Sequence, residues 1–333
     1  MSETLFHAYT PLILWTGLGL LLVRFVPQVL PRLMGRTLYW VGVPIEILAL
    51  ARRTNVSEGI GLALGVTVAA LSAGLILAWL SLVVGNRLCD RNSLTQDEKH
   101  TPQQEKLAPV LNGLPERSRQ GSFILSAMLG NTGFIGLAIA PLLVSDDALG
   151  LVVIYSISHN LVGTYGIGVF LASYFGRERE GNHWWVQIRD VLLVPSLWAF
   201  ILGSLTRSVT LPVPVESGLQ ASVWLVIPCA FLLMGIRLGQ IQGWQSFRIA
   251  LLPAFIKVVA LPGLVGIGTT VMGIEAGYRL ALVLMSGMPT AFASLILAEE
   301  YELDRELIAS SIVVTSAMLL LMIPLWLVWF GQT

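Results

Sequence analysis

The chain alternates long apolar stretches with short polar connections over almost its whole length. Hydropathy predicts ten membrane-spanning helices, each of which needs about 20 apolar residues. They lie near residues 8–24, 37–52, 59–85, 121–144, 148–175, 188–206, 217–236, 248–273, 278–298 and 307–330. One connection is long, Asn86 to Gly121, and its mixed charges indicate a solvated loop with room for a surface helix. The pattern predicts an all-α polytopic membrane protein.

Two of the predicted spans, the fourth and the ninth, are interrupted in the middle. The stretch Leu129 to Gly136 places Asn and Thr among three glycines, and Ser286 to Thr290 contains Pro289. Proline lacks a backbone donor and breaks a helix around it. Loosened backbone inside hydrocarbon is tolerated where protein or a wet cavity receives the freed groups. Paired breaks in two halves are the best sequence indication of a transporter's binding site.

Composition narrows the class of protein. The chain of 333 residues is 55% hydrophobic and 12% charged, with a mean hydropathy of +0.76. That is too little charge for a soluble domain of this size. Cys89 and Cys229 show no metal-ligand spacing, the four histidines are scattered, and no nucleotide-binding, zinc-protease or nucleophile-elbow motif occurs. We therefore expect no enzyme, no metal, no cofactor and no nucleic-acid partner.

The distribution of Lys and Arg predicts the orientation. With the N-terminus outside, the outward connections hold only Arg52, Arg53, Arg207 and Arg279, and the inward ones hold the other basic loop residues. Cytoplasmic loops carry such an excess of positive charge. We expect both termini outside, Cys89 in the cytoplasm, and residence in the cell inner membrane.

An odd number of spans per half places the two halves in opposite orientations. The sequence offers a faint sign of such a repeat. Adding 184 to the numbers of Gly19 and Pro44 gives Gly203 and Pro228, in the sixth and seventh spans. The second break comes earlier than this offset predicts, because the long connection has no later counterpart. The predicted five-helix repeats are residues 1–175 and 176–333.

Two charged side chains are expected near the middle of the bilayer. Lys257 lies nine residues past Arg248, about 14 Å along a helix, and Glu46 lies ten residues past Arg36. A charge at that depth costs at least about 2.5–3.5 kcal/mol and usually faces a partner or a cavity. Glu46 and Lys257 either pair, or find backbone partners and hold helices together, or serve coupling or substrate attraction.

Polar side chains at the breaks and in the fifth span are the remaining candidates. Unwinding exposes backbone N–H groups and the positive ends of half-helix dipoles, which suit an anion. The alternative is a structural kink satisfied by neighbouring helices. His159 is either a proton relay or a neutral core residue bonded to a carbonyl. The predicted substrate-binding residues are Asn131, Thr132, Gly133, Met288, Pro289, Thr290 and Asn160. The GxxxG spacing of Gly61 and Gly65 indicates close helix packing.

These motifs carry a family resemblance. The stretch Asn131 to Leu137 resembles the fourth-helix motif of the auxin efflux carrier family. The stretch Met288 to Ala291, continued by Leu297 to Tyr301 and Asp304, resembles that family's ninth-helix motif. The similarity extends loosely along the chain and includes Asn160.

The resemblance implies ten helices in a five-plus-five inverted repeat, with a scaffold domain and a transport domain that each draw on both repeats. It implies a site where the fourth and ninth helices cross, and elevator-like transport of auxin-like or small carboxylates. A sodium-coupled symporter of the bile-acid type is an alternative, although Ser286 to Thr290 holds no carboxylate for sodium. A receptor that binds without transport is a second alternative. The expected partners are an organic anion and the lipid bilayer, and a homodimer is left open.

Overall fold

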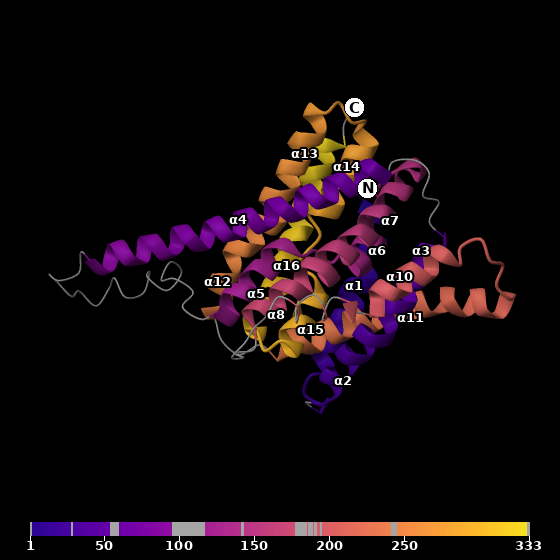
Figure 1. The fold of residues 1–333 in the computed structure, drawn as a ribbon, viewed down its shortest axis with the longest axis horizontal. Coiled ribbons are helices and arrows are strands. Elements are labelled where there is room, and N and C mark those ends of the chain that lie inside the picture. Colours follow the sequence, from indigo (N-terminus) through magenta and orange to yellow (C-terminus); the bar gives the residue numbers. More distant parts are fainter. Residues whose placement is uncertain are drawn as a thin grey trace.

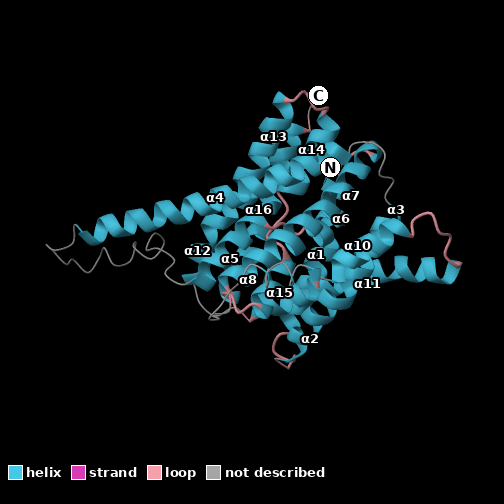
Figure 2. Cartoon of the chain, in the orientation of Figure 1, coloured by secondary structure: helices cyan, strands magenta, loops and turns pink. Residues whose placement is uncertain are grey.

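The chain folds into a bundle of helices joined by short turns (Figure 2). The computed structural model describes residues 2–27, 29–53, 60–94, 117–140, 143–176, 185, 189, 192–193, 195–240 and 245–331. Within these residues there is no β-strand, and one isolated bridge joins Gly130 and Thr290. The all-α class is therefore confirmed for the described part of the chain.

The helices follow the hydropathy pattern. In the first half they are α1 (Ser2–Leu22), α2 (Val29–Thr37), α3 (Val43–Arg53), α4 (Ile60–Leu94), α5 (Arg117–Met128), α6 (Leu137–Ile139), α7 (Leu149–Ser158) and α8 (Val169–Phe175). In the second half they are α10 (Pro195–Leu205), α11 (Val213–Gly239), α12 (Gln245–Phe255), α13 (Leu261–Val271), α14 (Ala276–Ser286), α15 (Phe292–Glu300) and α16 (Arg305–Phe330). Wider π-helical segments occupy Leu38–Gly42, Thr132–Gly136, His159–Gly168 and Ile256–Ala260.

Each predicted span falls on helical residues, but several ends differ. Four stretches are long and apolar enough to cross a membrane, namely Gly61–Gly85, Val213–Leu233, Ser246–Val271 and Arg305–Phe330. The count of ten spans stays a prediction. Helix α4 continues to Leu94 and projects from the bundle (Figure 1), because the polar residues after Gly85 include no Gly or Pro to stop it. Residues 95–116 of the predicted solvated loop lie outside the described residues, and its last residues, 117–121, belong to α5.

The helices pack in two groups, and each group draws on both halves of the chain. In the first group, α1 and α2 pack on α11, and α3 packs on α10 and α11. In the second group, α4 packs on α5 and α7, α12 on α16, and α14 on α13, α16 and α7. The groups touch each other where α3 meets α7 and where α11 meets α16. Both chain ends lie toward one end of the molecule, opposite α2 (Figure 1).

Glycine permits the closest contacts within the first group. A Cβ atom on Gly19 of α1 would lie 2.9 Å from Cα of Gly235 on α11. A Cβ atom on Gly203 of α10 would lie 2.8 Å from Cβ of Ala51 on α3. Larger side chains would therefore force both helix pairs apart.

The GxxxG pair on α4 behaves differently from the expectation. A Cβ atom on Gly61 or Gly65 would meet no described atom within 4 Å, so within the described residues neither glycine makes a close helix contact. The close approach on α4 occurs at Gly74, whose Cβ would lie 3.2 Å from Cα of Met128. GxxxG spacing marks a smooth helix face but does not say which helix covers it.

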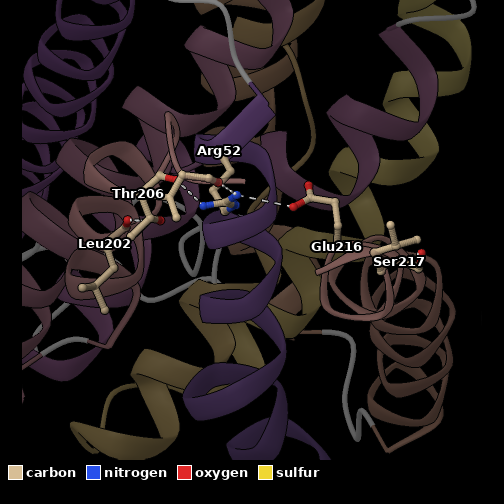
Figure 3. A network of polar contacts seen from close by, with 7 residues as sticks. Arg52, Leu202, Thr206, Glu216 and Ser217 are labelled. Atoms are coloured by element: carbon tan, nitrogen blue, oxygen red, sulfur yellow. Dashed lines mark hydrogen bonds and ion pairs between the residues drawn. The ribbon is translucent and has the colours of Figure 1, made fainter. Parts of the chain in front are cut away.

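Arg52 ties the end of α3 to the turn between α10 and α11 (Figure 3). Its guanidinium donates hydrogen bonds to the carbonyl oxygen of Thr206 and, at 2.9 Å, to that of Val209. It also forms an ion pair of 3.4 Å with Glu216 at the start of α11. The carbonyls that follow α10 have no helical partner, so this arginine supplies one and links three helices of the first group.

Asp304 joins the two halves at the opposite end of the second group. Its Oδ1 accepts a hydrogen bond of 3.0 Å from the Leu307 N–H and so caps α16. Its Oδ2 forms an ion pair of 2.9 Å with Arg119 on α5, and its carbonyl accepts a bond of 2.9 Å from the Ser122 hydroxyl. The acidic residue of the second motif is thus a helix cap and an interhelical tie.

Candidate functional site

The two predicted breaks are present, and they contact each other. Helix α5 ends at Met128 and α14 ends at Ser286. Beyond these ends both chains leave the helical conformation and run antiparallel, with Gly130 opposite Thr290. We call this contact the crossing.

Backbone hydrogen bonds join the two chains at the crossing. The Asn131 N–H donates to the Pro289 carbonyl at 2.7 Å, and the Ala291 N–H donates to the Leu129 carbonyl at 2.9 Å. Inside a membrane every backbone polar group needs a partner within the protein. Each break therefore supplies the partners that the other break needs.

Side chains from neighbouring helices satisfy further groups of the crossing. The Thr290 N–H donates to Thr315 Oγ1 at 3.0 Å, and the Thr290 hydroxyl donates to the Ser126 carbonyl at 2.9 Å. The Gly130 N–H donates to His159 Nε2 at 3.3 Å. These four N–H groups of the unwound backbone are therefore not available to an anion. A buried N–H left without a partner costs free energy. Each of these N–H groups instead donates to a carbonyl, a hydroxyl or an imidazole of the protein.

The first turn of α15 does offer free donors. The N–H groups of Phe292 and Ala293 make no hydrogen bond to any described residue. No side chain caps this end, since the residue before it is Ala291. All three residues line a small cavity beside the crossing. Unpaired N–H groups and the positive end of the helix dipole make a helix N-terminus a place for an anion.

The cavity beside the crossing has a volume of about 30 Å³. That volume holds about one water molecule. Residues from α3, α7, α15 and three of the π-helical segments surround it. The lining consists of Leu38, Glu46, Ile47, Gly130, Asn131, Gly133, Phe134, Ser156, Ile157, Asn160, Tyr165, Ala291, Phe292, Ala293 and Ile296.

Two amide side chains face this cavity. Asn131 Oδ1 accepts a bond of 3.2 Å from the Phe134 N–H and caps the π-helical segment, which leaves its Nδ2 group without a hydrogen bond to any described residue. Asn160 Nδ2 lies 3.5 Å from the Ser156 hydroxyl. It would lie 3.1 Å from a Cβ atom on Gly133, so the glycine leaves room for the amide. Both amides can donate into the cavity.

Glu46 is the one acidic residue in the lining of this cavity. Its side chain is 3% exposed, and its Oε1 has no hydrogen-bond partner among the described residues. The alternative in which Glu46 pairs directly with Lys257 is wrong, because the structure forms no ion pair between them in the described part of the chain.

Lys257 lies next to the crossing but outside the cavity lining, within the π-helical segment Ile256–Ala260. Its ammonium donates a hydrogen bond of 2.9 Å to the carbonyl of Ser286, the last residue of α14. The ammonium would lie 2.9 Å from a Cβ atom on Gly130, so a glycine is needed there. A cation is stabilised at the negative end of a helix dipole. The end of α14 is therefore the partner of Lys257, in place of the carboxylate of Glu46.

His159 is bound to the backbone of the crossing. Its Nε2 accepts from the Gly130 N–H, so this nitrogen carries no proton. Its ring stacks on Tyr155 with centroids 6.1 Å apart and planes at 15°. This geometry favours the alternative in which His159 is a neutral core residue over the one in which it relays protons. Its partner is a backbone N–H, whereas a carbonyl was expected.

The predicted residues thus separate into two sets. The cavity lining includes Asn131, Gly133, Asn160 and Glu46. The other predicted residues lie outside the lining and are Thr132, Met288, Pro289, Thr290, His159 and Lys257.

Sequence reasoning missed several lining residues, among them Leu38, Ser156, Tyr165 and Ile296. Apolar residues on a helix face look like ordinary core. Ser156 had a usable signal, because it lies one helical turn before Asn160. The π-helical segments were not predicted from the sequence. Such segments often occur at functional sites, so they would have pointed to this region.

Comparisons with known proteins find membrane transport proteins. Residues 182–327 match the family described as membrane transport protein. An uncharacterized transporter from Methanocaldococcus jannaschii is 25% identical over 211 residues, which cover 62% of this chain and 67% of that protein. An uncharacterized transporter from Methanothermobacter thermautotrophicus is 25% identical over 216 residues, which cover 64% and 69%.

Together with the apolar helices, these matches define the chain as a multi-pass membrane transporter. The match over residues 182–327 includes the second of the two motifs and supports the resemblance to the auxin efflux carrier family.

Proposed function

We propose that the protein is a secondary active transporter for organic anions and that the cavity beside the crossing is its substrate site. One observation carries the proposal. The free N–H groups of Phe292 and Ala293 and the Nδ2 group of Asn131 converge on the same cavity. All are hydrogen-bond donors, and the α15 dipole adds partial positive charge.

A carboxylate is the ligand that such a set of donors binds best. Hydrogen bonds to an ionised acceptor are roughly twice as strong as those between neutral groups. The apolar lining, which includes Phe134 and Ile47, suits the body of an auxin-like or small organic acid.

The site lies on the boundary between the two helix groups. Leu38, Glu46 and Ile47 come from the first group, and the remaining lining residues come from the second. A cavity of about 30 Å³ is too small for an organic acid. Binding therefore requires these helices to separate, which supports an elevator-like movement of the second group along the first.

Reciprocal contacts support the inverted repeat as well. Gly19 contacts Gly235, and Gly203 contacts Ala51. Adding 184 to the numbers of Gly19 and Ala51 gives Gly203 and Gly235, so the offset exchanges the two contacts. The same offset relates Leu48 and Leu232, whose carbonyl oxygens approach these glycines. Antiparallel pairing of the breaks also fits a two-fold relation between halves 1–175 and 176–333.

The position of Lys257 favours sodium-independent transport over the sodium-coupled alternative. Its ammonium already supplies a positive charge at the crossing and uses the Ser286 carbonyl, the kind of oxygen that a hard cation needs. Anion flux into vesicles should be equal with sodium and with choline as the bulk cation. A large stimulation by sodium would support the symporter instead.

The decisive experiment measures binding and flux on the purified protein. A thermal-shift screen of carboxylates identifies a ligand, and reconstituted vesicles then measure flux of that acid and of its matched neutral amide. We expect the acid to bind and cross the membrane and the amide to do neither well. Equal handling of acid and amide contradicts an anion site, and binding without flux identifies a receptor.

A further inference from the structure

A second, larger cavity lies between the two helix groups. Its volume is about 290 Å³, close to the lower end of typical small-molecule pockets. Helix α2 and the following π-helical segment form one wall, and the end of α15 with the start of α16 forms the other. The lining consists of Arg32, Arg36, Trp40, Ile296, Leu297, Glu299, Glu300 and Arg305. We call this cavity the vestibule.

The vestibule has a basic wall on the α2 side, and its other wall mixes apolar and charged side chains. Arg32, Arg36 and Trp40 recur every four residues and so project from one side of the helix. Arg305 adds a third guanidinium from α16. With the carboxylates of Glu299 and Glu300, three positive and two negative charges leave a net charge of +1. One carboxylate neutralises that charge, whereas a dicarboxylate leaves an excess negative charge.

Ile296 separates the vestibule from the site at the crossing. Its side chain lines both cavities. It belongs to α15, whose first turn provides the free donors of the site. Across the boundary, a Cβ atom on Gly35 of α2 would lie 3.9 Å from Ile296 Cγ1. Ile296 is the one described residue that the two linings share, so it lies on the direct path from the vestibule to the crossing.

We propose that the vestibule is a second binding site for the transported anion, where the arginines hold it before it passes Ile296. The proposal rests on the proposed function. The ligand class is a monocarboxylate with an apolar or aromatic body. Its carboxylate binds a guanidinium, which matches it in a bidentate geometry, while its body lies against Trp40 and Leu297. A basic wall also raises the local concentration of anions before they bind.

Neutralising the arginines tests this directly. In vesicles, Arg32→Gln and Arg36→Gln should each raise KM on the vestibule side by roughly five- to tenfold, with the maximal flux unchanged. The positive-inside prediction places that side in the cytoplasm. The variants should also flatten the dependence of KM on salt, because screening acts on the removed attraction. Arg248→Gln is the matched control, since Arg248 is exposed on α12 and lines neither cavity.

A second variant reports on the passage itself. Ile296→Phe enlarges the separating side chain and should lower the maximal flux, while the acid still protects Glu300→Cys, at an exposed residue of the vestibule lining that is not assigned to the ligand, from a thiol reagent. Native Cys89 and Cys229 are replaced by Ala in that background. Loss of the protection while flux persists overturns the proposal.

The outcomes separate the two proposals. If the wild-type protein neither binds nor carries any organic acid, the proposed function fails. If it carries an acid but Arg32→Gln and Arg36→Gln leave KM and its salt dependence unchanged, the proposed vestibule site is wrong and the proposed function stands. An effect seen only in vesicles that contain anionic lipid assigns the arginines to lipid headgroups and also overturns the vestibule site.

Discussion

Asn131 has two separable roles, because its side-chain atoms face different partners. Its Oδ1 caps the π-helical segment through Phe134, and its Nδ2 faces the cavity. Asn131→Asp keeps the capping oxygen and loses the donor. We expect this variant to insert but to lose most anion binding, and its buried carboxylate should lower the melting temperature, since a charge at this depth costs at least about 2.5–3.5 kcal/mol. Thermal unfolding and ligand titration on one purified sample measure both properties.

Asn131→Ala is the comparison variant, because it removes both the capping oxygen and the donor. Alanine removes the cap as well, and loss of a cap costs about 0.5–2 kcal/mol. It should therefore lower both stability and binding. If Asn131→Asp binds the acid normally, the amide is a structural cap and the substrate site lies elsewhere.

Glu46 and Lys257 make a second prediction, since the structure separates them. Lys257 is held by the Ser286 carbonyl, and Glu46 faces the cavity. The effects of substitutions on the free energy of unfolding usually add within about 0.3–0.5 kcal/mol when the residues are well separated and share no partners. The effects of Glu46→Gln and Lys257→Met on unfolding should therefore sum in the double variant. A double variant more stable than Lys257→Met alone would show that the two charges interact.

Sequence indicated which single residues were unusual but not what they touch. Depth along a helix marked Glu46 and Lys257 as unusual, and both side chains are buried inside the protein. Their partners come from other helices, and hydropathy carries no information on which helix lies beside which. The same holds for His159, whose backbone partner lies 29 residues away.

Among the helices, the glycine contacts of the first group predict a matched pair of effects. Gly19→Val and Gly203→Val should each destabilise the protein, because the added atoms would meet α11 or α3. Overpacking of this kind costs about 1–3 kcal/mol. Similar losses in thermal stability are expected at both positions, since the 184-residue offset exchanges their contacts.

Gly61→Val and Gly65→Val are the controls, because these glycines on α4 meet no described atom within 4 Å. Their melting temperatures in detergent should stay near that of the wild type. Strong destabilisation at Gly61 or Gly65, or none at Gly19 and Gly203, contradicts the packing described here.

The broken helices could be placed from sequence because proline and clustered glycine act locally. Pro289 and the glycines around Asn131 interrupt the two helices at the expected residues. The fate of the freed N–H groups could not be derived in this way. Thr315 and His159, which take up two of them, lie in distant parts of the sequence. Only the packed structure shows that the first turn of α15 offers free backbone donors to the cavity.

For the protein as a whole, the Lys and Arg asymmetry predicts the side on which each loop lies. Cys89 follows the apolar part of α4 and is expected in the cytoplasm. In a Cys229→Ala background, an impermeant thiol reagent added to intact cells should leave Cys89 unlabelled until the cells are lysed. Ser208→Cys, in the exposed turn after α10, should react in intact cells. The reverse pattern would invert the predicted topology.

The composition of the two helix groups was expected from the family resemblance, not from hydropathy. Hydropathy predicts spans in chain order, yet α1 packs on α11 and α3 on α10. The 184-residue offset, which two sequence matches suggested, exchanges the contact of Gly19 with Gly235 and that of Gly203 with Ala51. The structure adds the reciprocal glycine contacts, which support the proposed repeat. The repeat in turn suggests that the two groups move relative to each other.

That movement can be tested with one crosslink across the boundary and one within a group. Gly35 lies on α2 of the first group, and its Cβ would lie 3.9 Å from Ile296 of the second group and 3.6 Å from Leu233 of the first. In a chain without native cysteines, Gly35→Cys with Ile296→Cys and a short thiol crosslinker should abolish flux, and omission of the crosslinker should preserve it. The pair Gly35→Cys and Leu233→Cys should crosslink without loss of flux, because both residues stay in the first group. Full flux with the boundary crosslinked would mean that the groups do not slide past each other, and the elevator would have to be replaced by a local opening of α15.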